Sequence, residues 1–71
     1  MSFSRVYAEV AKRLLERGSL RAEDIRELEM MYGDAAWDAI DALITAGAAR
    51  RVGNRVEATD PDRLMRIAKM R

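Results

Sequence analysis

The sequence predicts a small, mainly α-helical domain that carries a β-hairpin before its last helix. Apolar residues recur at the three- and four-residue spacing of a helix in four segments. Glycines and one Asp-Pro pair separate these segments. Residues 51–57 combine β-branched side chains with a central Gly-Asn pair, which is typical of a tight hairpin. At 71 residues the whole chain, 1–71, is expected to be one domain with one core.

The first two helices are defined by their apolar spacing and their ends. Residues 3–17 carry one broad apolar stripe, and Gly18 follows where a left-handed residue ends a helix. Residues 19–21 leave room only for a short extended bridge. A second helix is expected over about residues 22–31, with two acidic residues in its first turn. Its inward side chains are predicted to be Ile25, Leu28 and Met31 or Tyr32.

The third helix is expected over about residues 35–46, after a break at Gly33. Asp34 is placed to cap it, and Gly47 closes it. Two apolar stripes compete for the core on this helix. One consists of Ala36, Ala39, Ile40 and Leu43, and the other of Trp37, Ile40 and Ile44.

The hairpin has two alternative registers. A two-residue loop sets Val52 opposite Arg55, whereas a three-residue loop sets Val52 opposite Val56. We expect the three-residue loop, because both valines then face the core. Beyond the hairpin, Asp60 and Pro61 form a helix start, as N-cap and first helical residue. The last helix is expected to reach about residue 70, with one face made of Leu64, Ile67 and Ala68.

The order helix, short strand, helix, helix, hairpin, helix resembles the winged helix-turn-helix superfamily. Two stretches carry the resemblance. Residues 43–56, LITAGAARRVGNRV, resemble the end of a recognition helix, its glycine stop and a basic hairpin, the wing. Residues 20–25, LRAEDI, resemble the strand that enters the first helix of the helix-turn-helix. The resemblance covers residues 3–59, with 60–71 as a C-terminal helical extension. It implies a recognition helix over residues 34–46 and a wing that touches DNA phosphates.

Composition makes an enzyme the least expected class. The chain has no Cys and no His, which removes thiolate nucleophiles, disulfides, Cys-ligated metal sites and the usual general base. No phosphate-loop or dinucleotide-binding glycine pattern is present, so we expect no cofactor and no metal. No apolar run approaches the length of a membrane span or of a signal-peptide core. The expected location is therefore cytoplasmic, without membrane association.

Charge is segregated along the chain. Residues 1–22 carry five basic and two acidic side chains, residues 23–46 one basic and seven acidic, and residues 47–71 seven basic and three acidic. The positive charge of the third segment includes the wing, where Arg side chains suit phosphate contacts. The candidate nucleic-acid-binding residues are Arg50, Arg51, Asn54 and Arg55. The expected function is thus a small DNA-binding module, related to transcription or chromatin, that contacts the phosphate backbone.

The third helix is a poor base reader, because it lacks the Arg, Lys, Asn and Gln side chains that read base edges. Its polar residues lie along one face, and Trp37 flanks them if the Ala36 stripe faces the core, as the family's spacing implies. The alternative function is therefore a protein-interaction adaptor that docks a basic partner. Its candidate face comprises Asp34, Trp37, Asp38, Asp41, Ile44 and Thr45. A third hypothesis is a homodimer, in which this face contacts the wing or the last helix of another copy.

Overall fold

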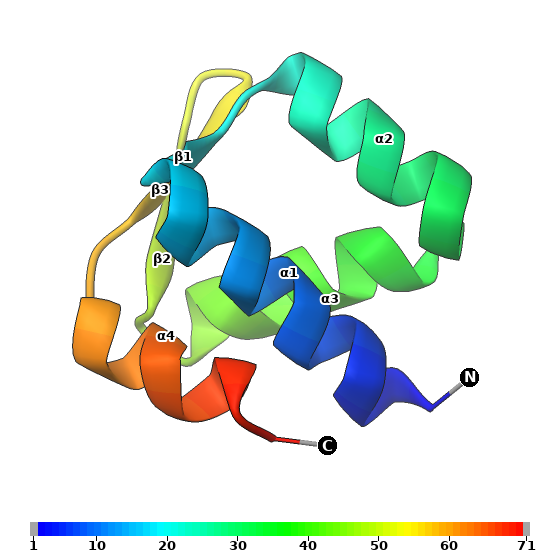
Figure 1. Ribbon diagram of the computed structural model, residues 1–71. Coiled ribbons are helices and arrows are strands. Elements are labelled where there is room, and N and C mark those ends of the chain that lie inside the picture. The colour runs from blue at the N-terminus through cyan, green and yellow to red at the C-terminus, as the bar shows by residue number, and fades with distance from the viewer. Residues whose placement is uncertain (1, 71) are drawn as a thin grey trace.

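The computed structural model describes residues 2–70 and folds them into four helices and a three-stranded antiparallel sheet (Figure 1). The helices are α1 (Phe3–Arg17), α2 (Ala22–Tyr32), α3 (Ala35–Thr45) and α4 (Pro61–Ala68). The strands are β1 (Ser19–Leu20), β2 (Ala49–Val52) and β3 (Arg55–Ala58). The prediction of a mainly helical domain with a hairpin is confirmed, and the extended bridge after the first helix becomes a third strand.

The helix ends follow the local signals. α1 has the predicted bounds, and Gly18 ends it at φ 77° while its N–H donates to the carbonyl of Leu14 at 2.8 Å. This left-handed backbone is the region that glycine adopts without a steric penalty. α4 begins as predicted, since the Asp60 carboxylate accepts from the backbone N–H of Arg63 at 3.1 Å. It ends at Ala68, earlier than the predicted residue 70.

The capping role expected of Asp34 is wrong. Asp34 precedes α3, but its side chain makes no capping hydrogen bond. Its backbone is already helical, at φ −64° and ψ −22°, whereas a capping residue normally has extended angles that turn its side chain back toward the first free N–H groups. The Asp34 carboxylate is therefore exposed beside α3 and free of the helix start.

β3 is the central strand of the sheet, with β1 and β2 on its two sides. Leu20 of β1 pairs with Val56 of β3, and both side chains are buried. In β2, Ala49 is buried on the same inner face of the sheet. This pairing anchors the hairpin to the helices through three small or branched apolar side chains.

The hairpin has a two-residue loop, so the predicted three-residue register is wrong. Val52 pairs with Arg55 across the turn, and Arg51 pairs with Val56. Val56 is 1% exposed but Val52 is 37% exposed, on the opposite face of the sheet. Gly53 supplies the positive φ at the first turn position, at 62°, as in a type II′ turn. The twist of such a turn matches that of the strands, which outweighs the burial of a second valine.

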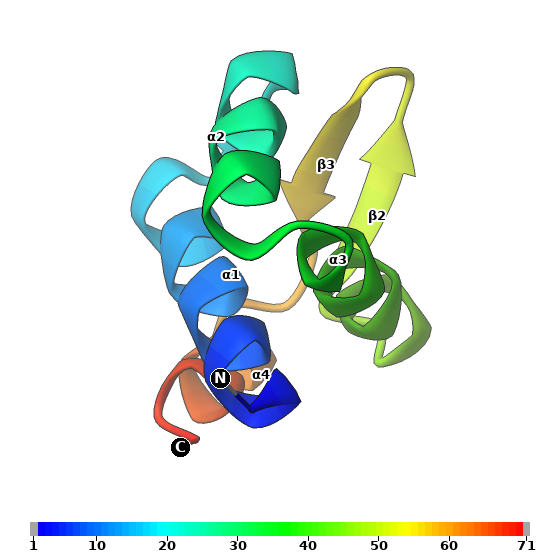
Figure 2. The ribbon, with the colours of Figure 1, turned by 90° about the vertical axis from the view of Figure 1, so that its right-hand side faces the viewer.

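The core lies where α1 crosses α3, α4 and the inner face of the sheet. In Figure 2, α2, α1 and α4 lie on one side of the molecule, and α3 and the hairpin on the other. The largest fully buried side chains are Val10, Leu14, Leu20, Leu28, Ile40, Leu43, Val56 and Leu64. All four helices and two strands contribute to this list, so one apolar core holds the described chain together. No helix within residues 2–70 is long and apolar enough to cross a membrane.

Candidate nucleic-acid interface

The outer face of the sheet carries most of the basic hairpin side chains. Successive side chains of a strand point to opposite faces. Because Ala49 and Val56 are buried on the inner face, Arg50 and Arg55 belong to the outer one. Glu57 pairs with Arg50 in the register and lies on that outer face too. The hairpin thus separates an apolar inner face from a charged outer face.

Two guanidinium groups share the carboxylate of Glu57. Arg50 Nη2 lies 3.3 Å from Glu57 Oε1, and Arg55 Nη2 lies 3.1 Å from Glu57 Oε2. The side chains of Arg50 and Arg55 are 68% and 46% exposed. One carboxylate cannot neutralise two guanidinium groups, so this cluster keeps a net positive charge. It also holds the two arginines side by side on the outer face.

Arg21 extends the cluster across the sheet, and sequence reasoning missed it. The register Leu20 with Val56 places the next residue, Arg21, beside Arg55. Arg21 is exposed, with an extended backbone at φ −88° and ψ 173°. In the sequence, Arg21 follows the apolar Leu20 and would therefore point to the opposite face of a strand. This places Arg21 beside Arg55 only when β1 is known to pair with β3. We call Arg21, Arg50, Arg55 and Glu57 the arginine face.

Arg51 belongs to a different surface from the other hairpin arginines. Its guanidinium carbon lies 5.5 Å from the ring centroid of Trp37, within the range of a cation–π contact. Its Nε donates to the carbonyl of Gly53 at 3.3 Å. Asn54 is exposed at the tip of the hairpin. The four predicted wing residues are therefore divided: Arg50 and Arg55 on the outer face, Asn54 at the turn, and Arg51 over α3.

On α3, the predicted division between core and surface is confirmed. Ala36, Ala39, Ile40 and Leu43 are buried, so this stripe faces the core. The opposite side presents an exposed row made of Asp34, Asp38, Asp41 and Thr45. Trp37 and Ile44 are partly buried and pack at the edge of the core. Trp37 is thus neither a fully buried core aromatic nor a free surface anchor, and we call these six residues the α3 face.

Several other basic side chains are held by carboxylates. Arg17 Nε lies 3.3 Å from Oδ1 of Asp24, the one buried charged side chain among residues 2–70. The same Asp24 accepts the backbone N–H of Arg21 at 3.1 Å through Oδ2. Arg13 pairs with Glu27 at 3.2 Å. These pairs fasten α1 and the first half of α2 to each other.

In the part of the chain that the structure describes, no three acidic side chains come close enough to hold a metal ion together. The basic C-terminal residue Arg71 lies outside the described residues. Neither a protein family, nor a curated protein, nor a solved structure matches this chain. The arginine face and the α3 face are consequently the observations from which a function can be argued.

Proposed function

We propose that this chain is a winged-helix module that binds the phosphate backbone of duplex DNA. The β2–β3 hairpin acts as its wing, and α3 occupies the place of the recognition helix without reading bases. The sequence of elements α1, β1, α2, α3, β2, β3, α4 supports the winged-helix assignment. The observation that carries the function is the arginine face, where the exposed guanidinium groups of Arg50 and Arg55 share one carboxylate and Arg21 lies beside Arg55 in the strand register.

Phosphate can replace Glu57 at little cost. Exposed ion pairs contribute only about 0–1 kcal/mol, because solvent screens them and two long side chains must be held in place. The two non-bridging oxygens of a DNA phosphate offer Arg50 and Arg55 one acceptor each, as the two oxygens of the Glu57 carboxylate do. Binding of several phosphates also releases the counterions condensed on DNA, which is the main source of sequence-independent affinity.

The α3 face argues for binding without base recognition. Its exposed row contains three carboxylates and a single hydroxyl, and none of the bidentate donors that read guanine or adenine. A helix with this row in the major groove would bring Asp38 and Asp41 toward phosphates of the same sign. We therefore assign the DNA contact to the outer face of the sheet.

A titration of random-sequence duplex DNA at several salt concentrations tests this proposal. The logarithm of the binding constant should fall linearly with the logarithm of salt concentration, with a slope of about −0.9 per phosphate contacted. Arg50→Ala with Arg55→Ala should reduce that slope by about 2 units, since two phosphate contacts are lost.

The matched control removes two exposed arginines from other surfaces, Arg26→Ala on α2 with Arg66→Ala on α4. It changes the net charge equally but leaves the arginine face intact, so the slope should change by less than half as much. Absence of binding at low salt contradicts the proposal. Equal effects of the two double variants would show that only the overall charge matters.

A second function is favoured by the α3 face: docking of a basic protein segment. Its carboxylates are exposed next to the partly buried Trp37, a residue type that is enriched in binding hot spots. An Arg- and Lys-rich peptide serves as the probe, with Trp37 fluorescence as the signal. Asp38→Asn with Asp41→Asn should abolish a salt-sensitive response. A response that persists in this variant contradicts docking on the α3 face.

A further inference from the structure

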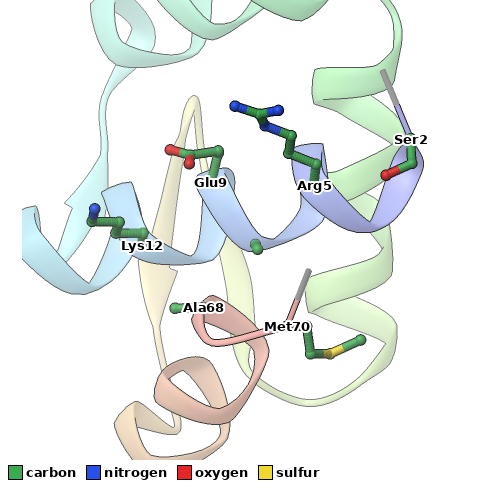
Figure 3. Close-up of a pocket in the computed structure, with 7 residues that line it drawn as sticks. Ser2, Arg5, Glu9, Lys12, Ala68 and Met70 are labelled. Carbon is green, nitrogen blue, oxygen red and sulfur yellow. The ribbon is translucent and has the colours of Figure 1, made fainter.

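The exposed side of α1 carries four charged residues in strict alternation of sign. Arg5, Glu9, Lys12 and Glu16 follow one another at intervals of four, three and four residues, which places them on one narrow stripe of a helix. All four are exposed, and none forms an ion pair within 4.0 Å in the described part of the chain. Figure 3 shows Arg5, Glu9 and Lys12 projecting from the same side of the helix. We call these four residues the α1 ridge.

The order of charges on the α1 ridge is complementary to itself when two copies run antiparallel. Arg5 then meets Glu16 of the partner subunit, and Glu9 meets Lys12 of the partner subunit. The two-fold axis repeats both contacts, so four pairs of opposite charge form and no like charges meet. The axis crosses the helix midway between the second and third ridge residues, at the level of Val10 and Ala11. A parallel arrangement would instead set each charge against its own copy.

We propose that this side of the molecule binds a second copy of the same chain in a two-fold dimer, with the two α1 ridges packed antiparallel. Two-fold dimers use one patch on both subunits, which must therefore be complementary to itself. The α1 ridge fulfils that requirement in its charge order. Ionic contacts of this kind fix the register of two helices more than they add affinity.

Two hollows with mixed polar and apolar linings flank the α1 ridge, and each brings one exposed methionine beside it. One lies between α1 and α4 with a volume of about 400 Å³, and the other between α1 and α2 with about 140 Å³. Both are lined by Glu9 and Lys12, so they lie on the two sides of the ridge. Met70 lines the first and Met31 the second, and these side chains are 46% and 55% exposed. The flexible methionine side chains can adapt to a packed interface.

The dimer leaves the arginine face accessible. α2, α1 and α4 lie on one side of the molecule, while the hairpin and α3 lie on the other (Figure 2). A partner seated on the α1 ridge would contact the first side only. This inference therefore does not depend on DNA binding by the hairpin, and the failure of either proposal leaves the other in place.

The same four charges can also pair along a single helix, as Arg5 with Glu9 or Lys12 with Glu16. Two variants of unchanged composition separate this effect from dimerisation. Glu9→Lys with Lys12→Glu gives the order plus, plus, minus, minus, which remains complementary in an antiparallel pair. Arg5→Glu with Glu9→Arg gives minus, plus, plus, minus, which sets like charges against each other at every contact.

The experiment measures the self-association of the full chain by sedimentation equilibrium, over a protein dilution series at low and high salt. The wild-type chain should form a dimer that high salt weakens, because solvent-exposed charges are screened. Glu9→Lys with Lys12→Glu should retain this dimer. Arg5→Glu with Glu9→Arg should raise its dissociation constant at least about 10-fold, equivalent to about 1.4 kcal/mol. Circular dichroism confirms that each variant is folded.

The two variants make the outcome decisive. If the charges act only within one helix, the first variant disrupts more neighbouring pairs than the second, and neither changes the mass of the particle. A wild-type chain that stays monomeric throughout the dilution series overturns the proposal. So does an equal dissociation constant for the two variants, because the order of charges would then have no influence on association.

Discussion

The guanidinium carbon of Arg51 lies 5.5 Å from the ring centroid of Trp37 and so joins the hairpin to α3. Arg51 is the hairpin arginine that turns to the inner side of the sheet, beyond the buried Val56 with which it pairs. The indole ring of Trp37 packs against the edge of the core, and the guanidinium group of Arg51 lies over the outer side of that ring. This contact links the two elements that carry the surfaces for which we propose binding functions.

Arg51→Ala should lower the free energy of unfolding by about 0.5–1 kcal/mol, the usual contribution of an exposed cation–π contact. Arg50→Ala is the matched control, because Arg50 precedes it in the strand and has only an exposed ion pair. Urea denaturation followed by Trp37 fluorescence measures both. We also expect the fluorescence of the folded protein to change in the Arg51 variant and to stay the same in the control. Equal stabilities of the two variants would argue against an energetic role of the stack.

Removal of the two helix-initiating aspartates should have unequal effects. The Asp60 carboxylate accepts the N–H of Arg63 at 3.1 Å, whereas Asp34 makes no capping bond. Asp60→Ala should therefore cost about 1 kcal/mol of stability, and Asp34→Ala less than about 0.5 kcal/mol. Thermal unfolding monitored by circular dichroism compares them. A larger loss from Asp34→Ala would contradict the capping pattern described above.

Gly53→Ala should destabilise the hairpin by about 1 kcal/mol, since a side chain at φ 62° is strained although nothing crowds it. Asn54→Ala provides the comparison, because no residue other than glycine has a positive φ within residues 2–70. It should change the stability by less than about 0.5 kcal/mol. Denaturant midpoints of the two variants give the difference. A tolerated Gly53→Ala would contradict the two-residue turn.

Asp24→Ala should be among the more harmful substitutions of a charged residue, at about 2 kcal/mol. It removes the acceptor of the Arg21 N–H and leaves Arg17 without its partner, at a site that is 6% exposed. Asp24→Asn keeps an acceptor oxygen and should cost about half as much. Glu23→Ala, an exposed neighbour, is the control. The order of the three unfolding free energies, measured in guanidinium chloride, tests this account.

Local signals explain why the helices could be predicted. The bounds of α1 follow from an apolar stripe that ends at Gly18. The start of α4 follows from an Asp-Pro pair, in which Asp60 caps the N–H of a residue only three positions further on. The residues of α3 leave two apolar stripes open, and the stripe that the family's spacing implies is the buried one, with Leu43 buried and Trp37 at the edge. All these features depend on residues separated by less than two helical turns.

Features that depend on how the strands pair are not predicted from the sequence. Arg21 joins the arginine face only because β1 pairs with β3, more than thirty residues further along the chain. The predicted hairpin register is wrong because the twist that the two-residue turn imposes outweighs the burial of a second valine. Arg50 and Arg51 lie on opposite faces because successive strand residues alternate, and the register decides that Arg50 is the outward one. A single basic wing surface is therefore not what the hairpin presents.

The corner after α3 is tied to the start of α4 by a set of short hydrogen bonds. The carbonyl of Ala48 accepts the backbone N–H of Thr59 at 3.0 Å, and the Thr59 hydroxyl donates to the carbonyl of Gly47 at 2.9 Å. Arg63 Nη1 donates to the carbonyl of Ala46 at 2.8 Å. Arg63 belongs to α4 and Thr59 lies two residues before this helix, so separation of the whole segment 59–68 from the core breaks all of these bonds. In native-state hydrogen exchange, the amides of α4 should consequently open with the end of α3 as one cooperative unit, rather than fray as a terminal helix.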